Sequence, residues 1–247
     1  MPNARIPDRI GVPGDDETHV WTARLSQVSA TLPALERLLS LDEKQTAGRF
    51  LRPGDRSRYI AAHGILRQLL GQYQSVAPAG LAFEKNAFGK PELAPRAAQP
   101  PLTFNLAHSD DVIVCVVALG RRVGVDVEAI RDDLDVMDMA ASQFSPAEAE
   151  ALRAVPPSAR IAAFFRCWTR KEAYVKARGE GLGFPLSHFT VSFDADEPPG
   201  LQWVLDDPSA PAQWSVFDFT PTPGYAGAVV VEGRPVRPLY RPFLPSR

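Results

Sequence analysis

The sequence predicts an α+β fold, because two long helical stretches alternate with groups of short strands. Apolar residues recur with helical spacing over 55–73 and over 158–177, and short apolar stretches bounded by turn residues follow each of them. The order helix, strands, helix, strands is typical of α+β proteins, and the two long helices suggest a duplicated plan. With 247 residues, the chain could form one compact body or two halves of roughly 120 residues.

The composition fits a globular protein and argues against several classes of partner. Hydrophobic residues make up 45% of the chain, and no run approaches the roughly 20 apolar residues of a membrane span. A formal net charge of -2 gives no reason to expect nucleic acid or an acidic membrane as a partner. The N-terminus lacks the apolar region of a signal peptide, and Cys115 and Cys167 lie in apolar surroundings. We therefore expect a cytoplasmic protein with two buried thiols.

The first part of the chain is expected to supply one strand and two helices. Residues 1–17 are polar and broken by Pro and Gly, which predicts a loose leader. Alternating residues over 19–25 predict a strand, and apolar spacing over 34–51 predicts a helix that ends before a Pro-Gly pair. A longer helix over 55–73 follows, with Asp55 as its expected N-cap.

Several strands should then form the first sheet. Short strands are predicted over 81–83 and 103–106, and a strand buried on both faces is predicted over 112–119, because that run hardly alternates. Gly120 and the two arginines after it indicate a turn into a strand over 123–128. The last two strands would therefore form a hairpin.

The second part repeats the order of helices followed by strands. Ser145, with Glu148 in the capping-box position, predicts a helix to about residue 155, and a longer helix over 158–177 ends at a glycine-rich segment. A Pro-rich tail from residue 234 is expected on the surface. Further strands are expected over 186–193, 202–205, 214–219 and 226–231.

Three acids and one lysine form the candidate functional cluster. On one predicted strand, Asp126 and Glu128 are two residues apart and share a face, while valines fill the other face. On the second long helix, Glu172 and Lys176 are four residues apart, so they also share a face. Carboxylate oxygens, with water and substrate phosphate, are the ligands that Mg²⁺ prefers. The cluster thus suggests a hard-cation site that binds phosphate.

Each of these features also has a simpler explanation. Paired carboxylates on a strand are common and usually solvated, and Glu172 with Lys176 could be an ordinary i,i+4 ion pair worth a few tenths of a kcal/mol. Arginines including Arg52 and Arg58 crowd the start of the first long helix, where they could meet a phosphate or only form a solvated basic face. His63 lies among core-facing helical residues and is expected to be structural.

The same residues lie in motifs that resemble those of a known family. GVDVE at 124–128 and WTRKEAYVK at 168–176 are similar to the two signature motifs of the 4'-phosphopantetheinyl transferases, in the longer Sfp-like type that activates surfactin synthetase. Two upstream stretches, FGKPEL at 88–93 and FNLAHS at 104–109, resemble further family motifs in the same order. The resemblance covers about 42–231.

The resemblance implies transfer of the phosphopantetheine arm of coenzyme A, the co-substrate, to a serine of an acyl or peptidyl carrier protein, releasing adenosine 3',5'-bisphosphate. It implies that Asp126, Glu128 and Glu172 hold Mg²⁺, or Mn²⁺ as an alternative, against the pyrophosphate. Lys176 would neutralise the leaving phosphate, and Glu172 would take the serine proton directly or through water.

By the same resemblance, the first half of the chain would bind the coenzyme. Ala107 stands where the family often has a serine, so a hydroxyl contact to phosphate is absent there. The positions that match coenzyme contacts are His108 and Lys44 for its phosphates, Arg52 or Arg58 as poorer matches, and Lys90 with Pro91 for the edge of the adenine pocket.

The longer family members resemble two fused copies of a smaller subunit. This implies two pseudo-symmetric halves, each with a long helix packed on a small, mainly antiparallel sheet. Coenzyme contacts would lie in the half 18–122, and the metal site and catalytic helix in the half 123–233, between the leader 1–17 and the tail 234–247. We expect a monomer, because one chain supplies both halves.

The carrier protein would need a docking surface beside the metal. We hypothesise that Met137, Met139 and Phe144, with Arg131, contribute to it, because apolar residues in an acidic stretch suit an adaptable contact. Ordinary core packing under a loop is an equal alternative for these residues.

Two other functions stay open from the sequence alone. A metal-dependent phosphodiesterase or nuclease would use the same acids and lysine, but the chain has no basic track with interleaved aromatic residues. A non-catalytic carrier-protein-binding module would keep the metal site only as a structural element. Retention of all four charged positions favours an enzyme over such a module.

Overall fold

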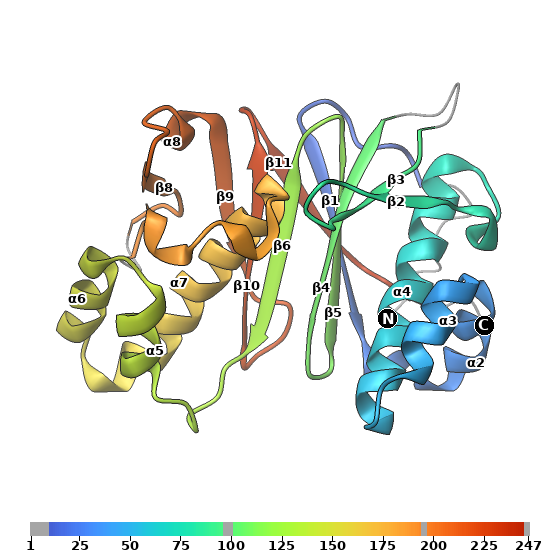
Figure 1. Ribbon diagram of the computed structural model, residues 1–247, viewed down its shortest axis with the longest axis horizontal. Coiled ribbons are helices and arrows are strands. Elements are labelled where there is room, and N and C mark those ends of the chain that lie inside the picture. Colours follow the sequence, from blue (N-terminus) through green and yellow to red (C-terminus); the bar gives the residue numbers. More distant parts are fainter. Residues whose placement is uncertain (1–9, 96–100, 194–196, 245–247) are drawn as a thin grey trace, which may run out of the picture.

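The computed structural model describes residues 10–95, 101–193 and 197–244, which form two halves side by side (Figure 1). Residues 1–9 of the expected leader thus lie outside the described residues. The first half contains β1 (Glu17–Arg24), α1 (Leu25–Val28), α2 (Leu32–Leu38), α3 (Leu41–Gly48), α4 (Pro53–Gln74), β2 (Phe83–Lys85), β3 (Pro91–Leu93), β4 (Leu102–Ser109) and β5 (Val112–Leu119). The second half contains β6 (Val123–Ala129), α5 (Val136–Gln143), α6 (Pro146–Ala154), α7 (Pro157–Arg178), β7 (Phe189–Val191), β8 (Leu201–Val204), α8 (Ala210–Gln213), β9 (Trp214–Phe219) and β10 (Tyr225–Glu232), and β11 (Arg237–Pro242) follows. Within the described ranges, every helix is too short or too polar to span a lipid bilayer.

The two halves repeat one topology, which confirms the predicted α+β fold with pseudo-symmetric halves. The sheet order is β1-β5-β4 in the first half and β6-β10-β9 in the second, and all of these pairs are antiparallel. In each half, a long helix and a two-stranded sheet, β2-β3 or β7-β8, follow the first strand. β11 adds a parallel strand beside β1 and so joins the end of the chain to the first half.

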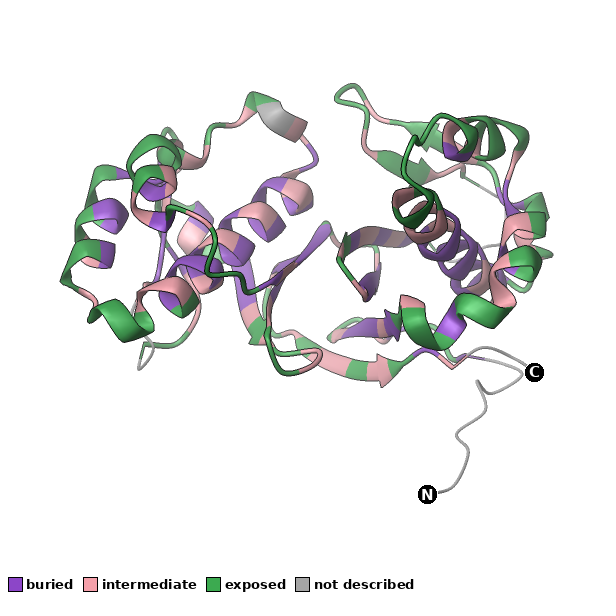
Figure 2. Cartoon of the chain, turned by 90° about the horizontal axis from the view of Figure 1, so that it is seen from below, coloured by how far each residue is buried: buried purple, intermediate pink, exposed green. Residues whose placement is uncertain are grey.

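Three hydrophobic clusters hold these layers together. In Figure 1, α4 covers one sheet and α7 covers the other, and each helix packs on the core of its own half. Between the sheets, valines from both halves form a third cluster, in which Val114, Val125 and Val229 are fully buried. Figure 2 shows buried residues along the sides of the long helices that face the sheets. Burial of apolar surface therefore joins the two halves into one body.

A buried ion pair is repeated at the same place in both halves. Arg67 is the fifteenth residue of α4 and Lys171 is the fifteenth residue of α7, and both helices have 22 residues. Arg67 Nε donates to Glu43 Oε2 at 2.7 Å, and Lys171 Nζ donates to Glu148 Oε2 at 2.6 Å. Both glutamates also complete a serine capping box, at the starts of α3 and α6. The same helix position therefore makes the same kind of contact in each half.

Several predicted elements are confirmed, and others have different boundaries. β5, β9 and α6 lie close to their predicted bounds, whereas β2, β4 and β7 begin or end a few residues away. The single helix over 34–51 is wrong, because Ser40 adopts an extended backbone and caps a new helix, α3, through Glu43. α4 begins at Pro53 with Arg52 as its N-cap, so Asp55 lies in the first turn and is not the cap.

The predicted hairpin between 112–119 and 123–128 is also wrong. β5 already has β1 and β4 at its two edges, so β6 pairs with β10 in the other sheet. Gly120, with φ of +62°, starts the turn that leads the chain from one sheet to the other. The Pro-rich tail differs as well, because residues 237–242 form the strand β11.

Candidate active site

The acid cluster is built where β6 passes against the last turns of α7. Valines at alternate positions of β6 face the cluster between the sheets, so the residues between them face the helix. A Cβ on Gly124 would lie 2.1 Å from the backbone oxygen of Ala173, which is closer than any side-chain atom can approach. The glycine therefore lets the strand approach α7 and brings its acids to the charged residues of the helix.

Asp126 and Lys176 form the central contact of the cluster. Lys176 Nζ donates to Asp126 Oδ1 at 2.5 Å, and the Asp126 side chain is only 5% exposed. Lys176 thus bonds across to the strand and not along its own helix. The other carboxylate oxygen, Asp126 Oδ2, is buried and has no hydrogen-bond partner among the described residues. Burial raises the pKa of Asp126 to about 7; Lys176 opposes the rise, and the charges of Glu128 and Glu172 add to it.

Glu128 and Glu172 complete the acidic side of the site. Ser109 Oγ, at the end of β4, donates to Glu128 Oε2 at 2.8 Å and accepts from the backbone N–H of Ala129 at 3.1 Å. This serine ties the first half to the acid-bearing strand. Glu172 is half-buried, and burial raises its pKa, while Lys176 lowers it and Glu128 raises it further. The three carboxylates are therefore close enough to interact electrostatically.

The acidic side of the site fits a hard divalent cation in its donor type. Carboxylate oxygens are the ligands that Mg²⁺ prefers, and the buried Asp126 Oδ2 has an unused acceptor position. Within the described ranges, however, no three His, Cys, Asp or Glu side chains are grouped closely enough to hold a metal by themselves. A bound cation would therefore need water or a substrate oxygen in addition to the protein ligands.

A cleft of about 760 Å³ opens beside Lys176. Its walls come from α3, α4, the β2-β3 sheet and β4 of the first half, whereas Lys176 comes from the second half. This volume lies within the usual range for small-molecule sites, roughly 300–1,000 Å³. Of the predicted coenzyme contacts, His108 and Pro91 line the cleft together with Lys176.

The predicted basic contacts differ in how far they are already engaged. Lys44, on α3, and Arg52, the N-cap of α4, are both exposed. Arg58 is half-buried, and its guanidinium donates to Asp55 Oδ1 at 2.9 Å and to the backbone oxygen of Asp110 at 2.8 Å. Arg58 therefore links α4 to the turn between β4 and β5, while Lys44 and Arg52 reach solvent.

Two histidines face the cleft. His108 is accessible, yet protein atoms surround it closely enough that loss of hydration lowers its pKa, and the positive charges of Arg58 and Lys176 lower it further. His63 stacks on Tyr59 with ring centroids 3.8 Å apart, and its Nδ1 lies 3.0 Å from the Tyr59 carbonyl oxygen. Sequence reasoning assigned His63 to the core. The sequence feature that could have placed His63 at the cleft is its spacing of four residues from Tyr59, which puts both side chains on one face of the helix.

Lys90 and Pro91 lie where the two strands of the β2-β3 sheet turn. Pro91 lines the cleft. The Lys90 ammonium is bonded elsewhere, to the backbone oxygens of Lys176 at 2.7 Å and Val123 at 3.1 Å. Of the two neighbours, only Pro91 therefore lines this cleft.

Sequence reasoning did not assign a role to Lys171, which precedes Glu172 in the motif. Lys171 is fully buried, and its ammonium donates to both carboxylate oxygens of Glu148 and to the backbone oxygen of Phe189 at 2.6 Å. This contact fixes the rotation of α7 about its own axis, so that Glu172 faces the acid cluster. The only sequence feature that could have pointed to a role for Lys171 is its position next to Glu172 in the motif.

The hypothesised docking residues lie only partly at the surface. Phe144 is 3% exposed and stacks on Phe164 with ring centroids 5.3 Å apart, so it belongs to the core, and its predicted docking role is wrong. Met137 and Met139 are half-buried against the same core, and Arg131 is exposed.

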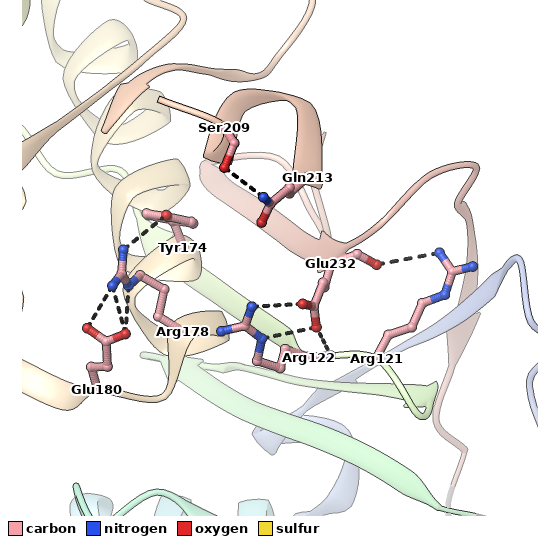
Figure 3. Close-up of polar contacts among 8 residues, drawn as sticks. All are labelled: Arg121, Arg122, Tyr174, Arg178, Glu180, Ser209, Gln213 and Glu232. Carbon is pink, nitrogen blue, oxygen red and sulfur yellow. Dashed lines mark hydrogen bonds and ion pairs between the residues drawn. The ribbon is translucent and has the colours of Figure 1, made fainter. Parts of the chain in front are cut away.

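A second group of arginines lies near the start of β6 and the end of α7 (Figure 3). Arg122 donates to Glu232 at 2.7 Å and also lines a second cavity of about 430 Å³. Arg178 donates to Glu180 at 2.7 Å. Acids thus already bind both arginines, and of the two only Arg122 lines the second cavity.

The fold and the site together define a class of protein, a two-half α+β protein with an acid–lysine site beside a small-molecule cleft. A family model described as the 4'-phosphopantetheinyl transferase superfamily matches residues 122–230. A second model, described as 4'-phosphopantetheinyl transferase, N-terminal, matches residues 20–119. The chain therefore belongs to the 4'-phosphopantetheinyl transferase family.

Individual relatives agree with this assignment. The chain is 39% identical over 218 residues to the 4'-phosphopantetheinyl transferase HetI of Nostoc sp.. The aligned region covers 88% of this chain and 89% of HetI. It is 24% identical over 191 residues to the 4'-phosphopantetheinyl transferase Sfp of Bacillus subtilis, covering 77% of this chain and 81% of Sfp. Among solved structures, the Thermotoga maritima holo-[acyl-carrier-protein] synthase aligns with 46% of this chain and 63% of its own, at 21% identity and a TM-score of 0.36, which is too low for a comparison of sites.

Proposed function

We infer that this protein transfers the 4'-phosphopantetheine arm of coenzyme A to a serine of an acyl or peptidyl carrier protein. The observation that carries the inference is the match of both halves of the chain to the transferase family. An acid–lysine contact beside a cleft of small-molecule size supports it, because the reaction needs charge neutralisation next to a bound coenzyme.

We propose that Asp126, Glu128 and Glu172 hold Mg²⁺, with Mn²⁺ as an alternative ion. The unpartnered Asp126 Oδ2 and the electrostatic coupling of the three acids support this proposal. A divalent cation would neutralise charge on the diphosphate of coenzyme A. Ser109 would keep Glu128 in place, because its hydroxyl already donates to that carboxylate.

In the transfer, the serine oxygen of the carrier forms a bond to the phosphorus that bears the arm. The bond from this phosphorus to the bridging oxygen of the diphosphate breaks, and adenosine 3',5'-bisphosphate leaves. We propose that Glu172 takes the serine proton, directly or through water, since burial raises its pKa and so strengthens it as a base. Lys176 would lie against the leaving phosphate, while Asp126 holds its ammonium in place.

We propose that the half 18–122 contacts the coenzyme and that the half 123–233 carries the metal site and the catalytic helix. One chain supplies both sets of residues, so a monomer would suffice. His108 would meet the phosphates from the cleft wall, and Pro91 with the Lys90 backbone would edge the adenine pocket. Lys44 and Arg52 are the preferred partners for an outer phosphate, and Arg58 is a poorer candidate because its guanidinium is already bonded.

Mass spectrometry of an apo carrier protein incubated with coenzyme A, Mg²⁺ and this protein tests the function. The carrier should gain the mass of the phosphopantetheine arm, and Asp126→Ala should leave it unmodified. Arg153→Met, which changes an exposed side chain on α6, is the matched control and should keep the activity. No mass gain would overturn the inference, and cleavage of DNA or RNA would favour a metal-dependent nuclease.

A further inference from the structure

The β2-β3 sheet belongs to the first half, but its tip, residues 86–90, lies against the end of α7 in the second half (Figure 1). Lys90 Nζ donates to the backbone oxygen of Lys176 at 2.7 Å and to that of Val123 at 3.1 Å. Lys176 belongs to the acid cluster, and Val123 begins the acid-bearing strand. One ammonium of the first half therefore binds the backbone of both segments that build the site.

Asn86 fixes the same tip to the helix end. Its Nδ2 donates to the backbone oxygen of Gly179 at 3.0 Å, and its Oδ1 accepts from the N–H groups of Phe88 at 2.9 Å and Lys90 at 3.0 Å. Gly179 has φ of +74°, and a Cβ there would lie 3.2 Å from both Asn86 Nδ2 and the Lys90 side chain. The tip and the end of α7 are therefore closely fitted.

The donors from Lys90 and Asn86 bind carbonyl groups at the C-terminal end of α7. The last four carbonyl groups of a helix lack partners within it, and the C-terminus carries partial negative charge. Lys176 lies in the last four residues of α7, and Gly179 is the C-cap. An ammonium and a side-chain amide from the first half thus cap the helix that carries the proposed catalytic groups.

The tip is also continuous with the wall of the cleft. Lys85 and Pro91, on either side of the tip, line the cleft together with Lys176. A coenzyme bound there would contact the same two strands whose tip caps α7.

We propose that the tip 86–90 is a clamp that positions Lys176 and Glu172 and that couples filling of the cleft to the placement of α7. Lys90 is a positioning residue that acts through the backbone of Lys176, and its side chain is not a coenzyme ligand. The kinetic test of this inference rests on the proposed transferase function, whereas the structural test does not need catalysis.

Amide hydrogen exchange of the full chain, with and without adenosine 3',5'-bisphosphate, tests the clamp directly. The nucleotide should slow exchange in the last turn of α7, residues 174–179. Lys90→Met and Asn86→Ala should each speed that exchange about tenfold, because each removes one hydrogen bond to a backbone oxygen at the end of α7, and should remove the effect of the nucleotide. Unchanged exchange in both variants, or nucleotide protection that survives them, would overturn the proposal.

Steady-state transfer to an apo carrier separates positioning from direct binding. Lys90→Met should lower kcat about tenfold, with the KM for coenzyme A nearly unchanged, and Asn86→Ala should do the same to a smaller extent. A raised KM with an unchanged kcat would instead make Lys90 a coenzyme ligand and overturn the proposal. Arg153→Met, an exposed cation on α6, is the control for both parameters.

Asn86→Ala keeps the test decisive if Lys90→Met does not fold. If the unchanged protein transfers nothing to any apo carrier, the proposed function fails, while the exchange measurement still decides whether the clamp exists.

Discussion

The two halves share a topology but differ at the helix positions that build the site. Glu172 and Lys176 are the sixteenth and twentieth residues of α7, and the residues at these positions of α4 are Gln68 and Gln72. The second half therefore carries a carboxylate and an ammonium where the first half carries two neutral amides.

The strands that face these helices differ in the same way. Asp126 pairs with the fourth residue of β10, and Trp21 pairs with the fourth residue of β5. Glu128 and Ala23 each pair with the second residue of the corresponding strand. The first half thus has an apolar face where the second half has two acids, so the same fold holds either a core or a charged site.

Comparing the two halves shows which charged residues of α7 belong to the shared scaffold and which belong to the site. The buried pair of Lys171 with Glu148 has a counterpart in Arg67 with Glu43, so it belongs to the scaffold of both halves. Lys176 has no charged counterpart on α4. Two lysines five residues apart on α7 therefore have different purposes, one for packing and one for the site.

Breaking the buried pair of the second half should give the largest loss of stability. The side chains of Lys171 and Glu148 are 0% and 1% exposed, so Lys171→Met leaves a buried carboxylate without its ammonium. Such a change typically costs about 3–5 kcal/mol. Urea denaturation should show this fall in the free energy of unfolding, and adding Glu148→Gln should restore part of it, because the acid is then neutral.

The matched change in the first half, Arg67→Met, should cost less. Glu43 is 14% exposed, so water can reach its carboxylate once the guanidinium is gone. The backbone oxygens of Pro78 and Leu81 also lose a donor, and we expect a total of about 1–3 kcal/mol. Equal losses at Arg67 and Lys171 would contradict the view that burial separates the two pairs.

Exchanging helix residues between the halves should affect transfer in one direction only. Glu172→Gln gives α7 the residue that α4 has at that position, and it removes a carboxylate without changing the size of the side chain. We expect kcat/KM for carrier modification to fall about 10²–10³-fold. Gln68→Glu, the reciprocal variant, should keep full activity. Full activity in Glu172→Gln would show that the carboxylate is not used.

The sequence predicted those parts of the structure that short-range signals determine. The helix α6 was found because Ser145 and Glu148 cap it locally, and the end of α7 was found because a glycine follows it. The hairpin after β5 failed, because a turn signal does not say which sheet the next strand joins. That outcome depends on β5 having neighbours at both edges.

For the site, too, the sequence predicted only what short-range patterns determine. The acids and Lys176 were found through motif spacing, and the structure brings Asp126 and Lys176 into contact. The contact of Lys90 with the end of α7 spans 86 residues and the boundary between the halves, so no local pattern indicates it.

The two halves also differ in how closely the first strand of the sheet approaches the long helix, β1 to α4 in the first half and β6 to α7 in the second. His19 and Gly124 each pair with the sixth residue of the central strand of their sheet. His19 reaches α4 through a bond of its Nδ1 to the Tyr73 hydroxyl at 2.6 Å. At Gly124, a Cβ would lie 2.3 Å from the backbone nitrogen of Ala177. Side chains thus fill the gap in the first half, whereas backbones meet in the second.

Gly124→Ala should therefore push α7 away from β6. Overpacking of this kind costs about 1–3 kcal/mol of unfolding free energy. It should also move Asp126 relative to Lys176, so kcat should fall in a protein that still unfolds cooperatively. Thermal unfolding and carrier modification measure the two effects, and an active Gly124→Ala protein of normal stability would refute the close approach.

The smallest expected effect is the response of the first half to acid. Burial, together with the charge of Arg241, lowers the pKa of His19 from 6.5 to about 4, and Glu17 opposes the shift. Because this pKa is lower in the folded than in the unfolded state, the unfolded state takes up the proton first as the pH falls. The contribution of His19 to stability is therefore complete above about pH 6.5 and is lost as the pH falls toward 4.

Each pKa unit is worth about 1.4 kcal/mol, and solvent screening reduces this, so we expect a loss of about 1–2 kcal/mol by pH 4. His19→Gln cannot titrate, so its unfolding free energy should fall less than that of the unchanged protein between pH 6.5 and 4. Urea denaturation over this range measures the difference. If the unfolding free energies of the two proteins fell in parallel with pH, His19 would not be held neutral by the first half. The matching positions His19 and Gly124 would then differ only in how they fill the space between strand and helix.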